Sequence, residues 1–236
     1  MKVLIIPDCH LKPYMFTRAA ELLKEGIAER AVYLGDTPDE WDMQYNVNRY
    51  EQTFDALIKF VKAFPNTLLC YGNHDLSYMW YELETGYSPA AESAVQRKIE
   101  ELKNCLSVNN PIKYVQRIDN VIFLHGGLSQ PFVDRYVSKY KQNDIDATLD
   151  IINSLGKIEM WNDESPIWLR PQYEKVKLFK PRKFLQVVGH TPVRNIEREG
   201  SVISCDVFST NPNGDPIGIC EYPVIDTITF DVESYY

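Results

Sequence analysis

The sequence predicts an α/β fold built as a single domain over residues 1–236. Apolar runs rich in β-branched residues alternate with stretches of helical apolar spacing over residues 2–70, which is the pattern of parallel strands joined by crossover helices. Polar side chains gather directly after the apolar runs, where ligands bind in parallel sheets. The 236 residues suffice for one sizeable core, and no repeat, low-complexity segment or linker divides them.

The amino-terminal part of the chain is expected to form three strands separated by two helices. Short apolar runs predict the strands, because a buried parallel strand is apolar on both faces. Apolar side chains spaced three and four residues apart predict the helices. In chain order the expected elements are strand 2–6, helix 16–30, strand 31–34, helix 48–63 and strand 67–70.

The rest of the chain combines polar helical stretches with further strands. Residues 76–110 and 131–160 have helical character, and Asp119-Asn120 predicts a hairpin turn between two strands. Prolines and weak periodicity predict an irregular loop over 161–183 that lies over the active face. The expected strands cover 112–118, 121–124, 184–188, 193–198, 201–206, 218–222 and 227–231.

The composition argues against two classes of binding partner, nucleic acids and membranes. A formal charge of -8 and a pI near 5.1 argue against binding to nucleic acid backbones, which needs clustered Lys and Arg. A phosphate-bearing substrate remains open if metal ions supply the positive charge. No apolar run approaches the roughly 20 residues of a membrane-spanning helix, and the apolar part of the amino terminus is too short for a secretory signal. We therefore expect no nucleic acid partner and no membrane; the oligomeric state is left open.

The cysteines indicate a reducing compartment. There are five of them, an odd number, and no two are spaced as Cys-x-x-Cys. That is neither a disulfide framework nor a zinc knuckle, so a cytoplasmic location is expected. Cys9 lies between two candidate ligands and is expected to be a small buried filler.

Five short polar motifs follow the apolar runs, and together they contain all four histidines of the chain. Any one of them could arise by chance, since Gly-Asn, for example, is a common turn dipeptide. Their shared position at strand ends gives them weight. The motifs are Asp8-Cys9-His10, Gly35-Asp36-Thr37-Pro38-Asp39, Gly72-Asn73-His74-Asp75, His125-Gly126-Gly127-Leu128-Ser129 and Gly189-His190-Thr191.

The side chains in these motifs predict a metal centre. Oxygen and imidazole ligands without thiolates suit manganese, iron or zinc rather than a cysteine-rich structural zinc site. Asp36 can bridge two cations, because the glycine before it lets the backbone approach closely. Two cations about 3.5–4 Å apart clamp the attacking and leaving oxygens of an in-line phosphoryl displacement. The residues thus predict a reaction class.

The order of the five motifs resembles the calcineurin-like metallophosphoesterase superfamily over Asp8 to His190. The His-Gly-Gly-Leu-Ser run is similar in particular to the phosphoprotein (serine/threonine) phosphatase branch. The resemblance implies a four-layer αββα sandwich, in which two mixed β-sheets are flanked by helices and a dinuclear metal site lies at the strand ends.

The resemblance also implies roles for single residues. One metal would be held by Asp8, His10 and Asp36, and the second by Asp36, Asn73, His125 and His190. The two ions would be manganese, with iron or zinc as alternatives. A hydroxide between the cations would attack phosphorus, because coordination lowers the pKa of water from 15.7 to about 7. His74 would act as general acid on the leaving oxygen, and Asp39 would orient its imidazole.

The sequence departs from the phosphatase branch in places. Glu40-Trp41 stands where the branch has Arg-Gly, and we expect these two residues to pack in a loop, with rejection of some substrates as an alternative. Arg170 is our candidate for the missing phosphate clamp, because the branch places an arginine on the loop before the strand of the last histidine and a planar guanidinium suits phosphate oxygens. An ion pair with an acidic neighbour on the surface is the alternative. The aromatic residues between Tyr78 and Tyr87 are expected to pack a helix; a nucleobase-stacking platform is the alternative. Cys205-Asp206 resembles the Asp-x-Gly that follows a late strand in the superfamily, but Val207 and Phe208 stand in place of the glycine, so we assign it no role.

Three functions remain open. The first is a metal-dependent phosphomonoesterase of serine/threonine protein phosphatase type, acting on a phosphorylated substrate. The second is a hydrolase of dinucleoside tetraphosphates or other nucleotides, favoured by the missing arginine and the nearby aromatic residues. The third, of another class, is a non-catalytic module that docks proteins on a degenerate metal site. The intact set of ligands and His74 speak against this third function.

Overall fold

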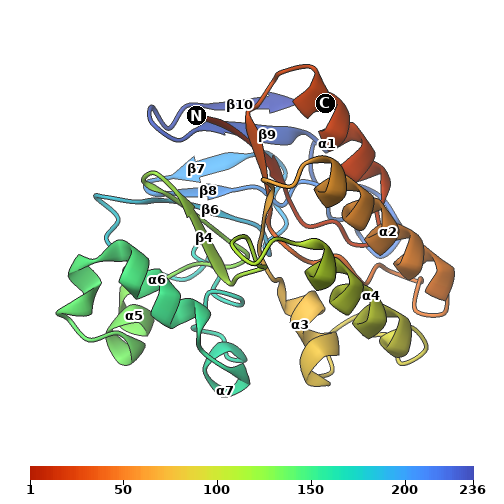
Figure 1. The fold of residues 1–236 in the computed structure, drawn as a ribbon, viewed down its shortest axis with the longest axis horizontal. Helices are drawn as coiled ribbons and strands as arrows, with labels where there is room; N and C mark the ends of the chain where they lie inside the picture. The colour runs from red at the N-terminus through yellow and green to blue at the C-terminus, as the bar shows by residue number, and fades with distance from the viewer.

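Two mixed five-stranded sheets lie face to face in the computed structural model, which describes residues 1–236, and helices cover their outer faces (Figure 1). The first sheet has the strand order β10-β9-β1-β2-β3, and the second has the order β4-β5-β6-β8-β7. The predicted four-layer α/β sandwich of two mixed sheets is therefore confirmed.

The first sheet is parallel in its centre and antiparallel on one side. β1 pairs with β2, and β2 with β3, in the same direction, whereas β9 and β10 run against their neighbours. Helices α1 (Tyr14–Lys24) and α2 (Val47–Ala63) are the crossovers that parallel pairing requires. The strands are β1 (Lys2–Ile6), β2 (Arg30–Tyr33), β3 (Leu68–Leu69), β9 (Tyr222–Asp226) and β10 (Val232–Tyr235).

The second sheet has the same design. β5, β6 and β8 are parallel, and β4 and β7 are antiparallel edges. Its strands are β4 (Val115–Ile118), β5 (Val121–Leu124), β6 (Leu185–Val188), β7 (Glu197–Glu199) and β8 (Val202–Ser204). The remaining helices are α3 (Asn73–Trp80), α4 (Glu92–Cys105), α5 (Gln130–Tyr136), α6 (Ile145–Asn153), α7 (Lys157–Met160) and the 3-10 turn Lys141–Asn143.

The two faces of β1 pack against different layers of the fold. Leu4 and Ile6 belong to a core shared with α1 and α2. Val3 and Ile5 belong to a second core of 14 buried residues, which also contains Phe123 of β5 from the facing sheet. Because successive side chains of a strand point to opposite faces and both faces are buried here, residues 3–6 are all apolar.

Several boundaries differ from the sequence prediction. The helix expected over 16–30 ends at Lys24, and the chain then turns through Gly26, whose φ of +78° is the left-handed region that favours glycine. The stretch expected to be helical over 76–110 is two helices, α3 and α4, separated by a loop. The stretch 131–160 is broken in the same way. The loop predicted over 161–183 is confirmed, since it contains no helix or strand.

The last two predicted strands were wrong by several residues. β9 begins where the strand expected over 218–222 was to end, and residues 227–229 form the turn after β9. The carboxylate of Asp226 accepts hydrogen bonds from the backbone N–H groups of Ile228 (2.8 Å) and Thr229 (3.0 Å). An aspartate side chain that caps its own turn therefore overrides the alternating polar and apolar pattern.

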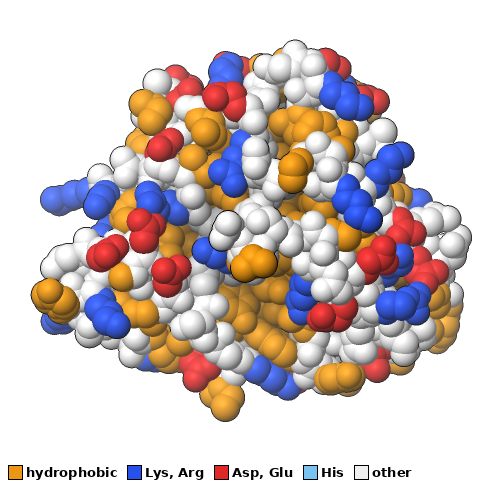
Figure 2. All heavy atoms as spheres, in the orientation of Figure 1, with side chains coloured by type: hydrophobic (Ala, Val, Ile, Leu, Met, Phe, Trp, Pro, Cys, Tyr) orange, Lys and Arg blue, Asp and Glu red, His pale blue; other side chains and the backbone are white.

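Three general features of the molecule concern its cysteines, its surface charge and its helices. All five cysteines are free, and burial raises the pKa of the Cys9 thiol to about 12, in keeping with a buried filler. Acidic and basic side chains are interspersed on the face shown in Figure 2. No helix combines the length and the apolar character needed to cross a membrane.

Candidate active site

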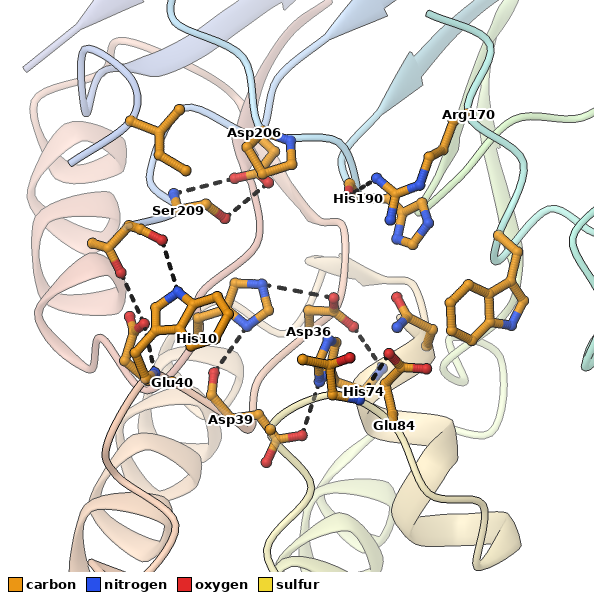
Figure 3. Close-up of a pocket in the computed structure, with 18 of the residues that line it drawn as sticks. His10, Asp36, Asp39, Glu40, His74, Glu84, Arg170, His190, Asp206 and Ser209 are labelled. Atoms are coloured by element: carbon orange, nitrogen blue, oxygen red, sulfur yellow. Dashed lines mark hydrogen bonds and ion pairs between the residues drawn. The ribbon is translucent and has the colours of Figure 1, made fainter. Parts of the chain in front are cut away.

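The five predicted motifs converge at one end of the two sheets. Each motif follows the carboxyl end of β1, β2, β3, β5 or β6, and there the structure has a cavity of about 330 Å³ (Figure 3). His10, Asp36, Asn73, His74 and His190 line the cavity. The other two predicted ligands, Asp8 and His125, are fully buried residues of the same strand ends.

Asp36 lies between two groups of potential ligands. In one group its carboxylate is close to His10 and His74, and in the other it is close to His125 and His190; within each group the donor atoms lie within 4.8 Å of one another. Its Oδ2 is 3.2 Å from His125 Nε2 and 3.8 Å from His10 Nε2. One carboxylate shared by two donor groups is the arrangement that the bridging prediction for Asp36 requires.

Glycines make this close approach possible. A Cβ atom on Gly72 would lie 2.0 Å from Asp36 Oδ1, and one on Gly35 would lie 2.3 Å from the Gly72 nitrogen. A Cβ atom on Gly189 would lie 2.0 Å from Asp8 Oδ1. Contacts this short exclude any side chain, so Gly72 and Gly189 are explained by the carboxylates packed against them, and Gly35 by the backbone of Gly72.

Two buried polar atoms at the centre of the site have no partner in the protein. Asp8 Oδ2 accepts a hydrogen bond from the His190 backbone N–H (2.8 Å), but Asp8 Oδ1 and His190 Nε2 have none. His125 Nε2 is 2.8 Å from Asn73 Oδ1 and 3.1 Å from His190 Nδ1. Buried polar atoms are normally satisfied, and oxygen and imidazole donors so placed fit metal ions as the missing partners.

The charges of the site are strongly coupled. Burial raises the pKa of the Asp36 carboxyl, but the imidazoles of His125, His74 and His10 outweigh burial and hold that pKa well below its usual range. Burial, together with the neighbouring Asp206 carboxylate, raises the pKa of Asp8. Several buried carboxylates this close together repel one another, so their ionised forms are stable only if positive charge lies between them.

His74 and Asp39 form a hydrogen-bonded pair at the edge of the cavity. The Nδ1–H of His74 donates to Asp39 Oδ2 (2.8 Å), so the other ring nitrogen, Nε2, is left for the cavity. Burial lowers the pKa of His74, but the carboxylates of Asp36 and Asp39 outweigh it and raise the pKa to about 9. Since a His74 nitrogen also lies in the donor group with His10 and Asp36, the geometry allows this residue a proton-transfer role or a ligand role.

Arg170 reaches the cavity from the 161–183 loop. Its Nη1 donates to the His190 carbonyl (3.0 Å) and to Thr191 Oγ1 (3.2 Å), while its Nε and Nη2 make no hydrogen bond. It is the only Lys or Arg among the lining residues, and Trp168 of the same loop packs edge-on against the His190 ring at 5.6 Å. The structure thus brings the predicted phosphate clamp to the predicted metal ligands.

Glu40 and Trp41 form part of the cavity wall and also pack their loop. Glu40 pairs with Lys12 and accepts hydrogen bonds from the Trp41 backbone N–H (2.9 Å) and Thr210 Oγ1 (2.8 Å). The Trp41 indole donates to the Thr210 carbonyl (2.9 Å). Both residues line the cavity, so the expected loop packing and an effect on substrates are compatible.

The aromatic residues from Tyr78 to Tyr87 lie outside the cavity. Tyr78 is fully buried and stacks on Tyr87 with ring centroids 4.3 Å apart, while Trp80 packs on Trp161 and Tyr81 is exposed. None of them lines the cavity. Packing, the first expectation for this stretch, therefore describes Tyr78, Trp80 and Tyr87. The aromatic side chains that could meet a substrate are Trp41 and Trp168.

Asp206 is the lining residue that sequence analysis left without a role. It follows β8 as Asp8 follows β1, it is 1% exposed, and it binds Ser209 through both carboxylate oxygens (3.2 Å to the nitrogen, 2.8 Å to Oγ). Burial raises its pKa to about 6. The signal that could have found it is its position directly after an apolar strand.

Comparison with known proteins places the chain in a known sequence family. The model of the family described as calcineurin-like phosphoesterase matches residues 1–225. No curated protein matches the chain.

Solved structures share the fold at low sequence identity. The chain is similar to a cold-active protein-tyrosine phosphatase of the psychrophile Shewanella sp., with 17% identity and a TM-score of 0.57 over 100% of this chain and 80% of that one. It is also similar to a protein serine/threonine phosphatase from Saccharomyces cerevisiae, with 15% identity and a TM-score of 0.52 over 100% of this chain and 79% of that one. At such identities the likeness shows a common fold.

Proposed function

The chain belongs to the calcineurin-like phosphoesterase family, and from that premise we propose that it is a phosphomonoesterase of serine/threonine protein phosphatase type. Family membership makes it a metal-dependent phosphoester hydrolase; the substrate type is the proposal. The observation that carries the proposal is the Asp36 carboxylate shared by two donor groups in a cavity whose only Lys or Arg is Arg170.

Two metal ions fit the donor groups. We propose Asp8, His10 and Asp36 as ligands of one ion and Asp36, Asn73, His125 and His190 as ligands of the other, with manganese first and iron or zinc as alternatives. Bound divalent cations stabilise charge on a transferring phosphoryl group and lower the pKa of water. The unpartnered Asp8 Oδ1 and His190 Nε2 support this assignment.

The remaining side chains would bind the substrate and move a proton. Arg170 would bind phosphate oxygens through Nε and Nη2, because its Nη1 is already held by His190 and Thr191. His74 would give a proton from Nε2 to the leaving oxygen, because its Nδ1–H is held by Asp39. A proton donor placed in this way typically contributes about 10²–10⁴-fold.

A nucleotide hydrolase is the second candidate. The observation that favours it is the pair of tryptophans in the cavity wall, Trp41 and Trp168, since bases stack on aromatic side chains. A third candidate, the metal-site docking module, is disfavoured by the complete set of donors; failure to take up metal would revive it.

We also propose a domain organisation and a cellular location. A single domain over residues 1–236 is supported by the core that both sheets share. A cytoplasmic location is supported by the five free cysteines.

The test compares two substrates on one preparation. The Mn²⁺-loaded protein is assayed on a phosphoserine/phosphothreonine peptide and on diadenosine tetraphosphate, with Asp36→Asn as the blank. Faster turnover of the peptide supports the phosphatase proposal. Faster turnover of the nucleotide contradicts it and moves the assignment to the second candidate. Metal binding without turnover of either substrate would contradict both.

A further inference from the structure

Both carboxylate oxygens of Asp39 accept hydrogen bonds from side chains of the protein. Oδ2 accepts the His74 Nδ1–H, and Oδ1 accepts two phenolic hydroxyls, from Tyr78 at 2.6 Å and from Tyr50 at 3.1 Å. Asp39, Tyr50 and Tyr78 are each at most 2% exposed. In a buried, low-dielectric environment, each hydrogen bond here restricts the carboxylate strongly.

The direction of the Tyr78 hydrogen bond is determined by a fourth group. The backbone N–H of Ser88 donates to the Tyr78 hydroxyl oxygen at 2.8 Å. Because an N–H group can only donate, the hydroxyl must direct its own proton to Asp39. Burial and the Asp39 carboxylate both raise the pKa of Tyr78, so the hydroxyl keeps that proton.

One helix carries both ends of this arrangement. His74 and Tyr78 lie four residues apart on α3, so their side chains share a face of the helix. Tyr50 comes from α2, and Asp39 lies on the loop after β2 with a φ of +66°. Hydrogen bonds from two helices therefore hold the Asp39 carboxylate. Without them, its χ2 angle would vary widely, because the χ2 distribution of aspartate is broad and two-fold.

We propose that the hydroxyls of Tyr78 and Tyr50 are positioning groups that fix the Asp39 carboxylate and, through it, the His74 imidazole. This inference rests on the proposed function, in which His74 is the general acid. It gives a role to a tyrosine of the 78–87 aromatic stretch that goes beyond packing.

Only substrates whose leaving group must be protonated should depend on the position of the His74 imidazole. A hydroxide ion derived from the water co-substrate forms a new bond to phosphorus while the bond between phosphorus and the leaving oxygen breaks. The bonding pair leaves with that oxygen, and the Nε2 proton of the His74 imidazolium passes to it. An alkoxide leaving group such as the serine side chain needs this proton. A 2,4-dinitrophenolate is stable as an anion and leaves without it.

The test compares two hydroxyl deletions with a matched control on these two classes of substrate. Tyr78→Phe is expected to lower kcat on the phosphoserine peptide about tenfold, and on 2,4-dinitrophenyl phosphate less than about twofold. Tyr50→Phe is expected to act in the same direction. The control is Tyr87→Phe: this ring stacks on Tyr78, but its hydroxyl donates to Glu92 outside the site, so both rates should stay unchanged.

A second readout does not depend on turnover. In Zn²⁺-loaded protein, which is diamagnetic, the Nδ1–H proton of His74, held by Asp39, should give a slowly exchanging downfield signal in the proton NMR spectrum. The signal should broaden or vanish in the double variant Tyr50→Phe/Tyr78→Phe and persist in Tyr87→Phe. Persistence of the signal in the double variant would overturn the inference, as would equal losses on both substrates or no loss on either.

The inference and the proposed function fail in different ways. If the metal-loaded wild type hydrolyses neither substrate, the proposed function is wrong, and the NMR comparison still decides the positioning. If the wild type hydrolyses both and Tyr78→Phe slows them equally, the function stands and the inference is wrong.

Discussion

The cavity has a floor, formed by side chains at the ends of the parallel strands, and a wall, formed by side chains of the surrounding loops, and the two are built in different ways. Floor side chains such as Asp36 and His190 leave from the ends of parallel strands, and they are held by buried hydrogen bonds and by glycines that permit close contact. Wall side chains such as Arg170 and Glu40 come from loops (Figure 3). The floor is thus set by the fold, whereas the wall is set by the sequence of the loops. In the proposed function the floor carries the chemistry, and the wall selects the substrate.

The largest effect is expected from the shared floor residue. Asp36→Asn should reduce turnover more than about 10³-fold, because losing a single electrostatic group that stabilises a transition state already costs about 10²–10³-fold. Both cation sites should weaken at once, as metal analysis of the purified variant would show. The control is Asp55→Asn, on the exposed face of α2, which should change neither property. Full metal content with lost activity would contradict a ligand role.

His74, at the edge of the cavity, should separate chemistry from metal binding. His74→Ala should retain the metal ions and slow hydrolysis of the phosphoserine peptide by about 10²–10⁴-fold, with a far smaller effect on 2,4-dinitrophenyl phosphate. Since a His74 nitrogen lies near His10 and Asp36, the opposite result is informative: release of metal from this variant would make His74 a ligand.

Wall residues should act on binding rather than on chemistry. Arg170→Lys should raise KM about tenfold, because an ammonium cannot replace a bidentate guanidinium, and it should leave kcat within about threefold. Steady-state kinetics on the phosphoserine peptide measures both constants. A fall in kcat at unchanged KM would place Arg170 in the transition state alone.

The smallest effect is expected at Glu40. Glu40→Gln leaves the largely buried Lys12 without its carboxylate partner, and it should lower the free energy of unfolding by about 1–3 kcal/mol. The ratio of peptide to nucleotide turnover should not change if the residue only packs the loop. Urea unfolding and the two-substrate assay test the two statements separately, and a changed ratio would give Glu40 a part in substrate choice.

The difference between floor and wall also explains what could be predicted. Residues of the floor follow short apolar runs, and parallel strands bring their carboxyl ends to one edge, so local sequence and a simple topology rule suffice. Asp206 obeys the same rule, but it was missed because Val207 and Phe208 follow it in place of the expected glycine. Here the position at a strand end was the better guide than the motif.

Contacts between distant segments could not be predicted. The Tyr78 hydroxyl meets Asp39 from 39 residues away, and the helical pattern around Tyr78 is equally consistent with simple packing. The strand expected over 227–231 failed for a local reason, because the Asp226 side chain caps a turn there. Burial patterns in the sequence predict which residues are inside, but they do not predict which polar atoms meet.

In the function proposed for this chain, the floor holds two metal ions through a shared Asp36 and uses them to hydrolyse phosphoesters. The most direct measurement titrates metal-free protein with Mn²⁺ and follows bound metal and hydrolysis of 2,4-dinitrophenyl phosphate in the same samples. We predict binding of two ions per chain, activity that rises with occupancy, and loss of both in Asp36→Asn. Hydrolysis that persists in a metal chelator, or two bound ions without hydrolysis, would contradict the claim.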